Sequence, residues 1–341
     1  MTASLPLMSS PVSSGLKLHH PKAQIFIPDR VPEAEAMGRV THLGIGAHQD
    51  DLEFMAFHGI LNCYRRTDRW FAGVTCTDGA GSARAGRYAD YTDEQMQAVR
   101  VEEQNAAAMV GGYAAMIQLG HPSSSVKSSS DRSLQDDLLT ILEHTQPEVV
   151  YTHNPADKHE THIGVVIAAL DAMRALPAEK RPKAVYGCEV WRNLDWMPDE
   201  EKVLLNLSGN ANLAAALNSL FDSQIAGGKR YDLAVTGRQH ANATFLDAHS
   251  IDETTTVAYA MDLTPLVATP SLDIADFVLS AIHRFELDVR GKLIRKMGSR
   301  SGSGKAVQDE GHAGGHAERM RRFERGMDSI TVGHLTATSA S

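Results

Sequence analysis

The sequence predicts an α/β fold in which one mostly parallel sheet carries helices on both faces. Short apolar runs rich in β-forming residues alternate along the chain with segments of helical periodicity, and the runs end at turn residues or small residues. Alternation at this spacing is typical of strand–helix–strand units, whose strands pair in parallel and whose crossovers are right-handed. The expected architecture is therefore Rossmann-like.

Six strands are expected, each an apolar run with a recognisable end. Residues 39–47 are rich in β-forming residues and end in small ones, and residues 70–79 close on the turn signal Asp78-Gly79. The remaining predicted strands span residues 114–120, 148–154, 184–191 and 202–208.

Five helices are expected between and after these strands. Residues 93–112 have helical periodicity and stop at paired glycines, which suit a helix C-terminus. Residues 133–146 form an amphipathic pattern that Pro147 brings to an end. The remaining predicted helices span residues 162–176, 210–221 and 271–285.

One domain explains the chain better than two. A length of 341 residues would allow two domains, but no internal repeat and no linker divides the chain. We expect an N-terminal arm at residues 1–38 and a single domain over residues 39–341. Its motifs lie within residues 41–165, and a C-terminal elaboration begins at about residue 200.

The composition argues against nucleic-acid-binding, membrane-spanning and secreted proteins. A net charge of −9 argues against a nucleic-acid partner, which normally faces a basic surface. No apolar run approaches the roughly 20 residues of a membrane span, and the N-terminal residues lack the apolar stretch of a secretory signal. The cysteines, Cys63, Cys76 and Cys188, are scattered and suit a reducing compartment. We therefore expect a cytoplasmic protein; whether it forms a homo-oligomer is left open.

Acidic residues and a histidine follow the first predicted strand directly, in the stretch GIGAHQDDLE. Ligands bind beyond the carboxyl ends of the strands in open parallel sheets, and His48, Asp50 and Asp51 fall at that place. His48 and Asp51 are three residues apart, so one turn can direct both at a single ion. Imidazole nitrogen and carboxylate oxygen suit Zn²⁺, which takes three protein ligands in catalytic sites.

A second loop of the same kind follows the strand at residues 148–154. In PADKHETHIG, His159 and His162 are three apart, and the second of them opens a helix. Each loop alone has a simpler explanation, because aspartates cap helices and histidine pairs at this spacing are common. Together, at two strand ends of one parallel sheet, they predict a metal site whose third ligand comes from the second loop.

Four segments of the chain resemble one known family. AHQDDLE is similar to the A-H-P-D-D-x-E signature of the PIG-L/LmbE-like zinc-dependent deacetylases, and HETH is similar to their second motif. VTCTDGAGS and RVEEQNAAAMVGG resemble the second-strand segment and the R-x-x-E-x-x-A-A helix of that family. The resemblance covers residues 41–165 and implies a metal-dependent amide hydrolase that removes N-acetyl groups from amino sugars.

The resemblance also implies roles for individual residues. His48, Asp51 and His162 would hold Zn²⁺, although such sites accept other divalent metals. Asp50 would be the general base for the metal-activated water, and His159 the second catalytic group, either as an acid or as a stabiliser of the oxyanion. The corresponding substrate-binding residues would be Arg100 and Asp78.

Some positions depart from the family pattern or have a simpler explanation. Gln49 replaces the usual proline, which loosens the turn, and Thr161 stands where aspartate is usual, so that Glu160 or Asp157 is left to support His159. LGHPSSSV, residues 119–126, carries His121 and serines where the family often has a substrate-binding aspartate. Arg100 also suits a surface ion pair with Glu102 or Glu103, and Asp78 suits a turn.

The expected substrate is a small N-acetylated sugar or an N-acetylglucosamine-containing conjugate. One alternative is a metal-dependent amidase that hydrolyses a non-acetyl amide or a thiol-sugar conjugate instead of an N-acetyl group. The other is a sugar-binding protein without catalysis. Residues 221–245, which include His240, resemble a binding loop and are a candidate lining of the substrate pocket, although no spacing rule identifies them. Residues 298–306 lack the spacing of a phosphate-binding loop and are expected to be a flexible loop. Residues 311–326 are expected to be a solvated tail or a lid.

Overall fold

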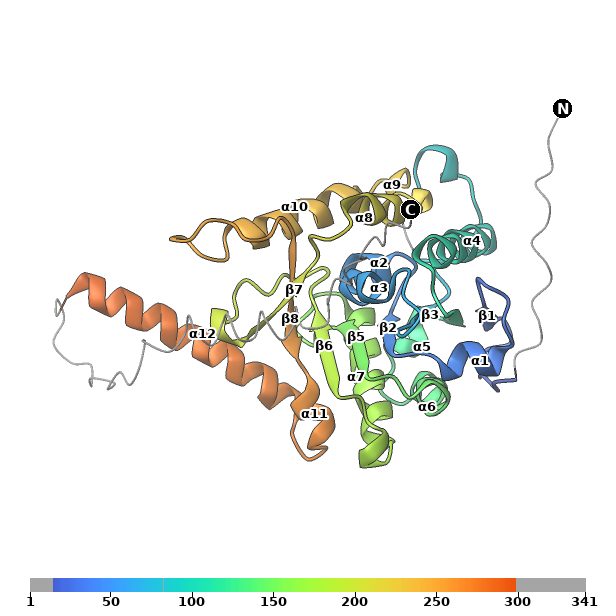
Figure 1. Ribbon diagram of the computed structural model, residues 1–341, viewed down its shortest axis with the longest axis horizontal. Coiled ribbons are helices and arrows are strands. Elements are labelled where there is room, and N and C mark those ends of the chain that lie inside the picture. The colour runs from blue at the N-terminus through green and yellow to red at the C-terminus, as the bar shows by residue number, and fades with distance from the viewer. Residues whose placement is uncertain (1–14, 82, 299–341) are drawn as a thin grey trace, which may run out of the picture.

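The computed structural model describes residues 15–81 and 83–298, which are built around one eight-stranded sheet (Figure 1). The strand order is β1-β4-β3-β2-β5-β6-β8-β7. In chain order the strands are β1 (Gln24–Phe26), β2 (His42–Gly46), β3 (Phe71–Thr77), β4 (Ala115–His121), β5 (Val149–His153), β6 (Ala184–Cys188), β7 (Lys202–Asn206) and β8 (Val257–Asp262).

The central strands β4, β3, β2, β5 and β6 are parallel, whereas β1 and β8 run antiparallel to their neighbours. This confirms the predicted α/β fold with a mostly parallel sheet. The six predicted strands are β2 to β7. Two strands were missed: β1 has only three residues, and β8 inserts between β6 and β7, although it follows both in the chain.

Helices cover both faces of the sheet and enclose two separate cores (Figure 1). On one face α7 packs against β2 and β5, with α6 beside it. On the other face α2 packs against β2 and β5 and α3 against β2 and β3, and α8 contacts α2. The α-helices are α1 (Glu33–Gly38), α2 (Asp51–Met55), α3 (Phe57–Cys63), α4 (Asp93–Gly111), α5 (Ser123–Val126), α6 (Ser133–Thr145), α7 (Glu160–Ala175), α8 (Ala211–Asn218), α9 (Asp222–Ile225), α10 (Tyr231–Thr244), α11 (Thr264–Ala268) and α12 (Ile274–Met297).

Two glycines let α2 approach the sheet closely. A Cβ atom on Gly44 would lie 2.9 Å from Leu52 Cδ2, and one on Gly73 would lie 2.6 Å from Leu52 Cδ1. Larger residues at these strand positions would push α2 away. Close packing of Leu52 therefore fixes the distance between the sheet and α2, and with it the position of the loop that precedes α2.

The N-terminal arm predicted at residues 1–38 is in part folded. Its described part contains β1, which pairs with β4, and α1, which contacts α6. His19 adds a link through its ring, whose Nδ1 lies 2.8 Å from Asp137 Oδ1. The predicted tail or lid at residues 311–326 lies outside the described residues.

No described helix has both the length and the apolar character that crossing a membrane requires.

A buried histidine in α3 should make stability depend on pH. His58 is only 6% exposed, and its Nδ1 lies 2.9 Å from the hydroxyl of Tyr151. Burial, with a smaller contribution from His42, lowers the pKa of His58 from 6.5 to about 3. The folded protein keeps the ring neutral while the unfolded chain binds a proton below pH 6.5. Stability should therefore be complete above that pH and fall as pH drops, by about 2 kcal/mol at about pH 5.

Chemical denaturation at neutral pH and at about pH 5 measures this effect. His58→Gln should remove about 2 kcal/mol of the difference between the two conditions, because glutamine takes up no proton in this range. The exposed His249 gives the control variant His249→Gln, which should keep the wild-type difference. An unchanged pH dependence in His58→Gln would show that this histidine does not contribute.

Candidate active site

The loop between β2 and α2 adopts a strained backbone conformation, which hydrogen bonds to residues of other elements stabilise. Asp50 has a φ of 104°, which an L-residue seldom adopts and which costs about 1–3 kcal/mol. Its backbone N–H donates to Gln104 Oε1 at 3.3 Å, and Gln224 Nε2 donates to the carbonyl of Gln49 at 3.4 Å. The Gln49 amide in turn donates to Thr77 O at 3.3 Å, so this residue ties the turn to β3 instead of loosening it.

Three side-chain atoms from the two predicted loops converge beyond the strand ends. His48 Nδ1 lies 3.3 Å from Asp51 Oδ2 and 3.2 Å from His162 Nε2, and His162 Nε2 lies 3.5 Å from Asp51 Oδ2. A tetrahedral zinc ion with bonds of about 2.0–2.1 Å spaces its ligand atoms about 3.3–3.4 Å apart. The donor types and all three separations therefore fit a zinc ion.

The orientation of His162 is set from behind by Asp157. Asp157 Oδ2 lies 3.2 Å from His162 Nδ1, and both side chains are buried. A proton on Nδ1, donated to this carboxylate, leaves the lone pair of Nε2 facing His48 and Asp51. A carboxylate behind a histidine is the usual partner of a metal ligand. The sequence offered Asp157 as support for His159. Its carboxylate accepts the backbone N–H of His159 at 3.4 Å, but the imidazole ring that it contacts is that of His162.

His153, at the end of β5, belongs to a second, overlapping set of donors that the sequence analysis did not single out. With Asp51 and His162 it offers a ligand atom within 4.8 Å of the others. Its Nε2 lies 3.4 Å from Asp51 Oδ2, but the same nitrogen accepts the backbone N–H of Ala47 at 2.9 Å. Because that hydrogen bond uses the lone pair, His48 is the better third ligand. His153 instead stacks on His162, with ring centroids 3.8 Å apart.

The two adjacent aspartates experience opposite electrostatic effects. Burial raises the pKa of Asp51, but the nearby His162 and His153 outweigh it and hold that pKa well below its usual value. Burial and the charge of Asp51 raise the pKa of Asp50 well above its usual value. A divalent cation between the three donors favours the ionised form of both groups.

His159 lies beside the three donors and faces the cavity. Its ring centroid is 5.0 Å from that of His48 and 4.6 Å from that of His162. Its Nδ1 is buried and has no hydrogen-bond partner among the residues that the structure describes. Burial and the neighbouring His48 lower its pKa. The ring is therefore in place to exchange a proton with a bound molecule.

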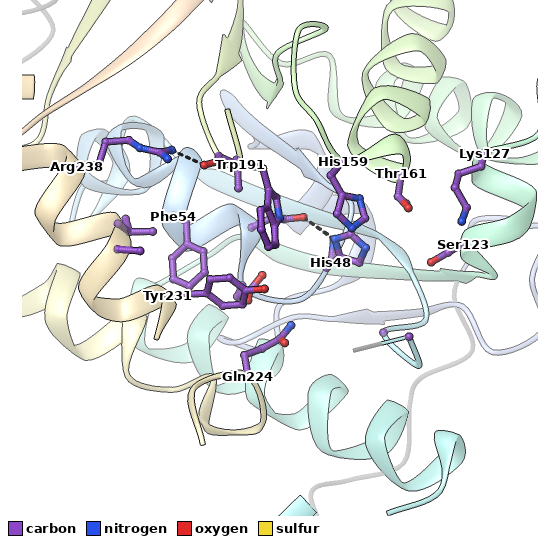
Figure 2. Close-up of a pocket in the computed structure, with 17 residues that line it drawn as sticks. His48, Phe54, Ser123, Lys127, His159, Thr161, Trp191, Gln224, Tyr231 and Arg238 are labelled. Carbon is purple, nitrogen blue, oxygen red and sulfur yellow. Dashed lines mark hydrogen bonds and ion pairs between the residues drawn. The ribbon is translucent and has the colours of Figure 1, made fainter. Parts of the chain in front are cut away.

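A cavity of about 410 Å³ opens over these residues (Figure 2). One wall is aromatic, with Tyr231 5.9 Å from Trp191 and 5.9 Å from Phe54 between ring centroids. The residues that line the cavity are His48, Asp50, Asp51, Phe54, Gly79, Gly81, Ser123, Lys127, His159, Thr161, Val190, Trp191, Gln224, Tyr231, Ala234, Val235 and Arg238.

Arg100 and Asp78, the predicted substrate-binding residues, do not line this cavity. Arg100 is fully buried behind it, where the guanidinium donates to Gly79 O and, at 3.2 Å, to Gln224 Oε1. Asp78 accepts a hydrogen bond of 2.9 Å from Gln97 and borders a different hollow. Arg100 supports the cavity lining through Gly79 and Gln224. Direct contact with substrate stays a prediction for Arg100 and for Asp78.

The segment at residues 221–245 does border the cavity, but mainly as a helix. Gln224 of α9 lines it, as do Tyr231, Val235 and Arg238 of α10. Those three positions are four and three residues apart, which is the spacing of one helix face. That periodicity is the signal in the sequence that indicates a helix here. Arg238 also donates to Val190 O and so links α10 to the loop after β6 (Figure 2).

Comparison with known proteins places the motifs in one family. The family model described as PIG-L, GlcNAc-PI de-N-acetylase, matches residues 43–173, which contain His48, Asp50, Asp51, His159 and His162. No curated protein matches the chain significantly.

Several solved structures share the fold at low sequence identity. GalB, the 4-carboxy-2-hydroxymuconate hydratase from Pseudomonas putida, has a TM-score of 0.52 and 18% identity over 66% of this chain and 96% of that one. A conserved protein from Thermus thermophilus has a TM-score of 0.51 and 16% identity over 69% and 99%. The N,N'-diacetylchitobiose deacetylase from Pyrococcus horikoshii has a TM-score of 0.51 and 14% identity over 69% and 88%. The motifs, the fold and the family match agree, and residues 43–173 of this chain are a PIG-L family domain.

Proposed function

We propose that this protein is a zinc-dependent hydrolase that removes an N-acetyl group from an amino sugar or an N-acetylglucosamine-containing conjugate. The observation that carries the proposal is the convergence of His48 Nδ1, Asp51 Oδ2 and His162 Nε2 at separations of 3.2 to 3.5 Å. Other divalent metals accept the same nitrogen and oxygen donors, so zinc is the first choice among several.

The comparisons support deacetylation of a sugar-related substrate. The matched family model is described by a de-N-acetylase activity, and one protein with a similar fold is a diacetylchitobiose deacetylase. GalB, a hydratase, has the same fold, so the fold alone does not choose the reaction. The assignment of a deacetylation reaction therefore rests on the family match together with the catalytic groups around the cavity.

The groups around the three donors suit hydrolysis of an amide. A bound zinc ion lowers the pKa of water to about 7 and polarises a carbonyl group. The carboxylate of Asp50 lines the cavity beside the ligand Asp51 and accepts the proton of the attacking water. His159, whose ring lies beside those of His48 and His162, gives a proton to the departing amine nitrogen or a hydrogen bond to the developing oxyanion. The aromatic wall holds the rest of the substrate against this centre.

Release of acetate from N-acetylated sugars tests the proposal. The zinc-loaded protein should release acetate and a primary amine from N-acetylglucosamine conjugates, a chelator should abolish the reaction, and added zinc should restore it. Turnover of other amides without acetate release would favour the amidase alternative. Tight sugar binding without any product would favour the binding protein and contradict the proposed reaction. A cytoplasmic location stays a prediction of the sequence.

A further inference from the structure

One end of the active-site cavity presents hydrogen-bond donors and no carboxylate. This polar end is formed by Ser123, Lys127 and Thr161, whose hydroxyl groups and ammonium group gather on the side opposite Arg238 (Figure 2). Among the described residues, the acidic side chains that line the cavity are Asp50, the proposed general base, and Asp51, a proposed metal ligand. The polar end is therefore a region of positive charge and donor groups.

Thr161 shows that this end lacks a partner. The residue is only 2% exposed and lines the cavity, yet its hydroxyl makes no hydrogen bond to any residue of the described chain. This hydroxyl is therefore available to donate a hydrogen bond to a molecule in the cavity, or to accept one from it. Thr161 also lies in the first turn of α7, where unpaired backbone N–H groups and the helix dipole favour negative charge.

Lys127 supplies the charge at the polar end. It follows the short helix α5 directly, and within residues 15–81 and 83–298 no carboxylate lies within ion-pair distance of its ammonium group. Its side chain also borders a neighbouring hollow that contains Asp131 and Glu160. An ammonium group in this position is available to a ligand and not committed to a side chain.

We infer that the polar end binds an oxyanion carried by the substrate, such as a phosphate, sulfate or carboxylate group on the N-acylated amino sugar. This inference rests on the proposed function and names its substrate class. An ammonium group and two hydroxyl groups together satisfy several oxygens of one anion through charge-assisted hydrogen bonds. The aromatic wall at the other end of the cavity then takes the uncharged part of the molecule.

Kinetics with matched sugars test the inference. The wild-type protein should have a higher kcat/KM for a phosphorylated or sulfated N-acetylglucosamine, or for N-acetylmuramic acid, than for N-acetylglucosamine. The three arms distinguish phosphate, sulfate and carboxylate. Lys127→Met should lower the ratio of kcat/KM for the best anionic sugar to that for the neutral one by about 10- to 100-fold, because a charge-assisted hydrogen bond is lost. Thr161→Val, which keeps the shape, should lower the ratio less.

Lys158→Met is the matched control, because Lys158 is exposed in the loop before α7 and does not line the cavity. It should leave the ratio unchanged. Equal ratios in the wild type and in Lys127→Met would overturn the inference while leaving deacetylation intact.

Binding to the metal-free full-length chain separates this inference from the proposed function. N-acetylglucosamine 6-phosphate or 1-phosphate should bind about 10- to 100-fold more weakly to Lys127→Met than to the wild type in calorimetry at low salt. Loss of this difference would contradict the oxyanion site. If the difference in binding is found but no sugar yields acetate, the oxyanion site is supported and the proposed reaction is contradicted.

Discussion

Replacing Asp50 by Asn should lower kcat by about 10²- to 10⁴-fold while the protein keeps its metal. The Asp50 side chain lines the cavity next to Asp51, and it is not one of the three converging donors. Asparagine preserves the size of the side chain but cannot accept a proton at the pH of the reaction. Acetate release under saturating substrate measures the effect, and metal analysis of the same sample confirms that the site is loaded.

The control for this variant is Asp136→Asn, because the Asp136 side chain is 57% exposed on α6 and does not line the cavity. It should retain wild-type turnover. The strained φ of 104° at position 50 is tolerated by Asn as well as by Asp, so the variant is expected to fold. Full activity of Asp50→Asn would eliminate this aspartate as the general base.

Replacing Arg100 by Met should lower the free energy of unfolding by about 3 kcal/mol, because buried acceptors lose their donor. The guanidinium holds Gly79 O and Gln224 Oε1, and its charge favours the ionised form of Asp50. Activity should fall mainly through kcat, since the loop around the base loses its support. Chemical denaturation together with steady-state kinetics measures both effects.

Arg290→Met is the control, because that side chain is 65% exposed on α12, and its stability should change by less than about 0.5 kcal/mol. The same experiment decides between two roles of Arg100. If stability stays at the wild-type value and only KM rises, Arg100 contacts the substrate, as the family resemblance implied. A loss of stability supports the positioning role that its buried contacts indicate.

The centre of the fold was predictable because it depends on local signals. Each of the strands β2 to β6 is an apolar run with its own end, and alternation with helices specifies parallel pairing. The convergence of the two loops follows from that pairing. β2 lies directly beside β5, with Ile45 opposite Thr152, so the residues after both strands emerge at the same edge.

The later part of the chain was less predictable because its placement depends on distant contacts. β8 pairs between β6 and β7, and no local pattern in Val257–Asp262 specifies that position. The helical spacing of Tyr231, Val235 and Arg238 is visible in the sequence, but their position over the cavity is not. Nearby glycines made the segment resemble a loop.

Details of the candidate site also required the structure. His153 ends a buried strand, and a histidine at such a position is most simply explained as a core residue. Its contact with Asp51 depends on the fold and is not visible in the sequence. The choice of Asp157 as the partner of His162 depends on how the loop folds back before α7. Spacing alone left several partners equally possible.

Metal analysis of three histidine variants tests the central claim most directly. The wild type should bind one zinc ion per chain, and His48→Ala and His162→Ala should lose it, because each removes one of three ligands. His153→Gln should keep the ion, since the nitrogen of His153 nearest Asp51 is already bonded to the backbone N–H of Ala47. Retention of zinc by His48→Ala together with its loss from His153→Gln would contradict the proposed metal centre.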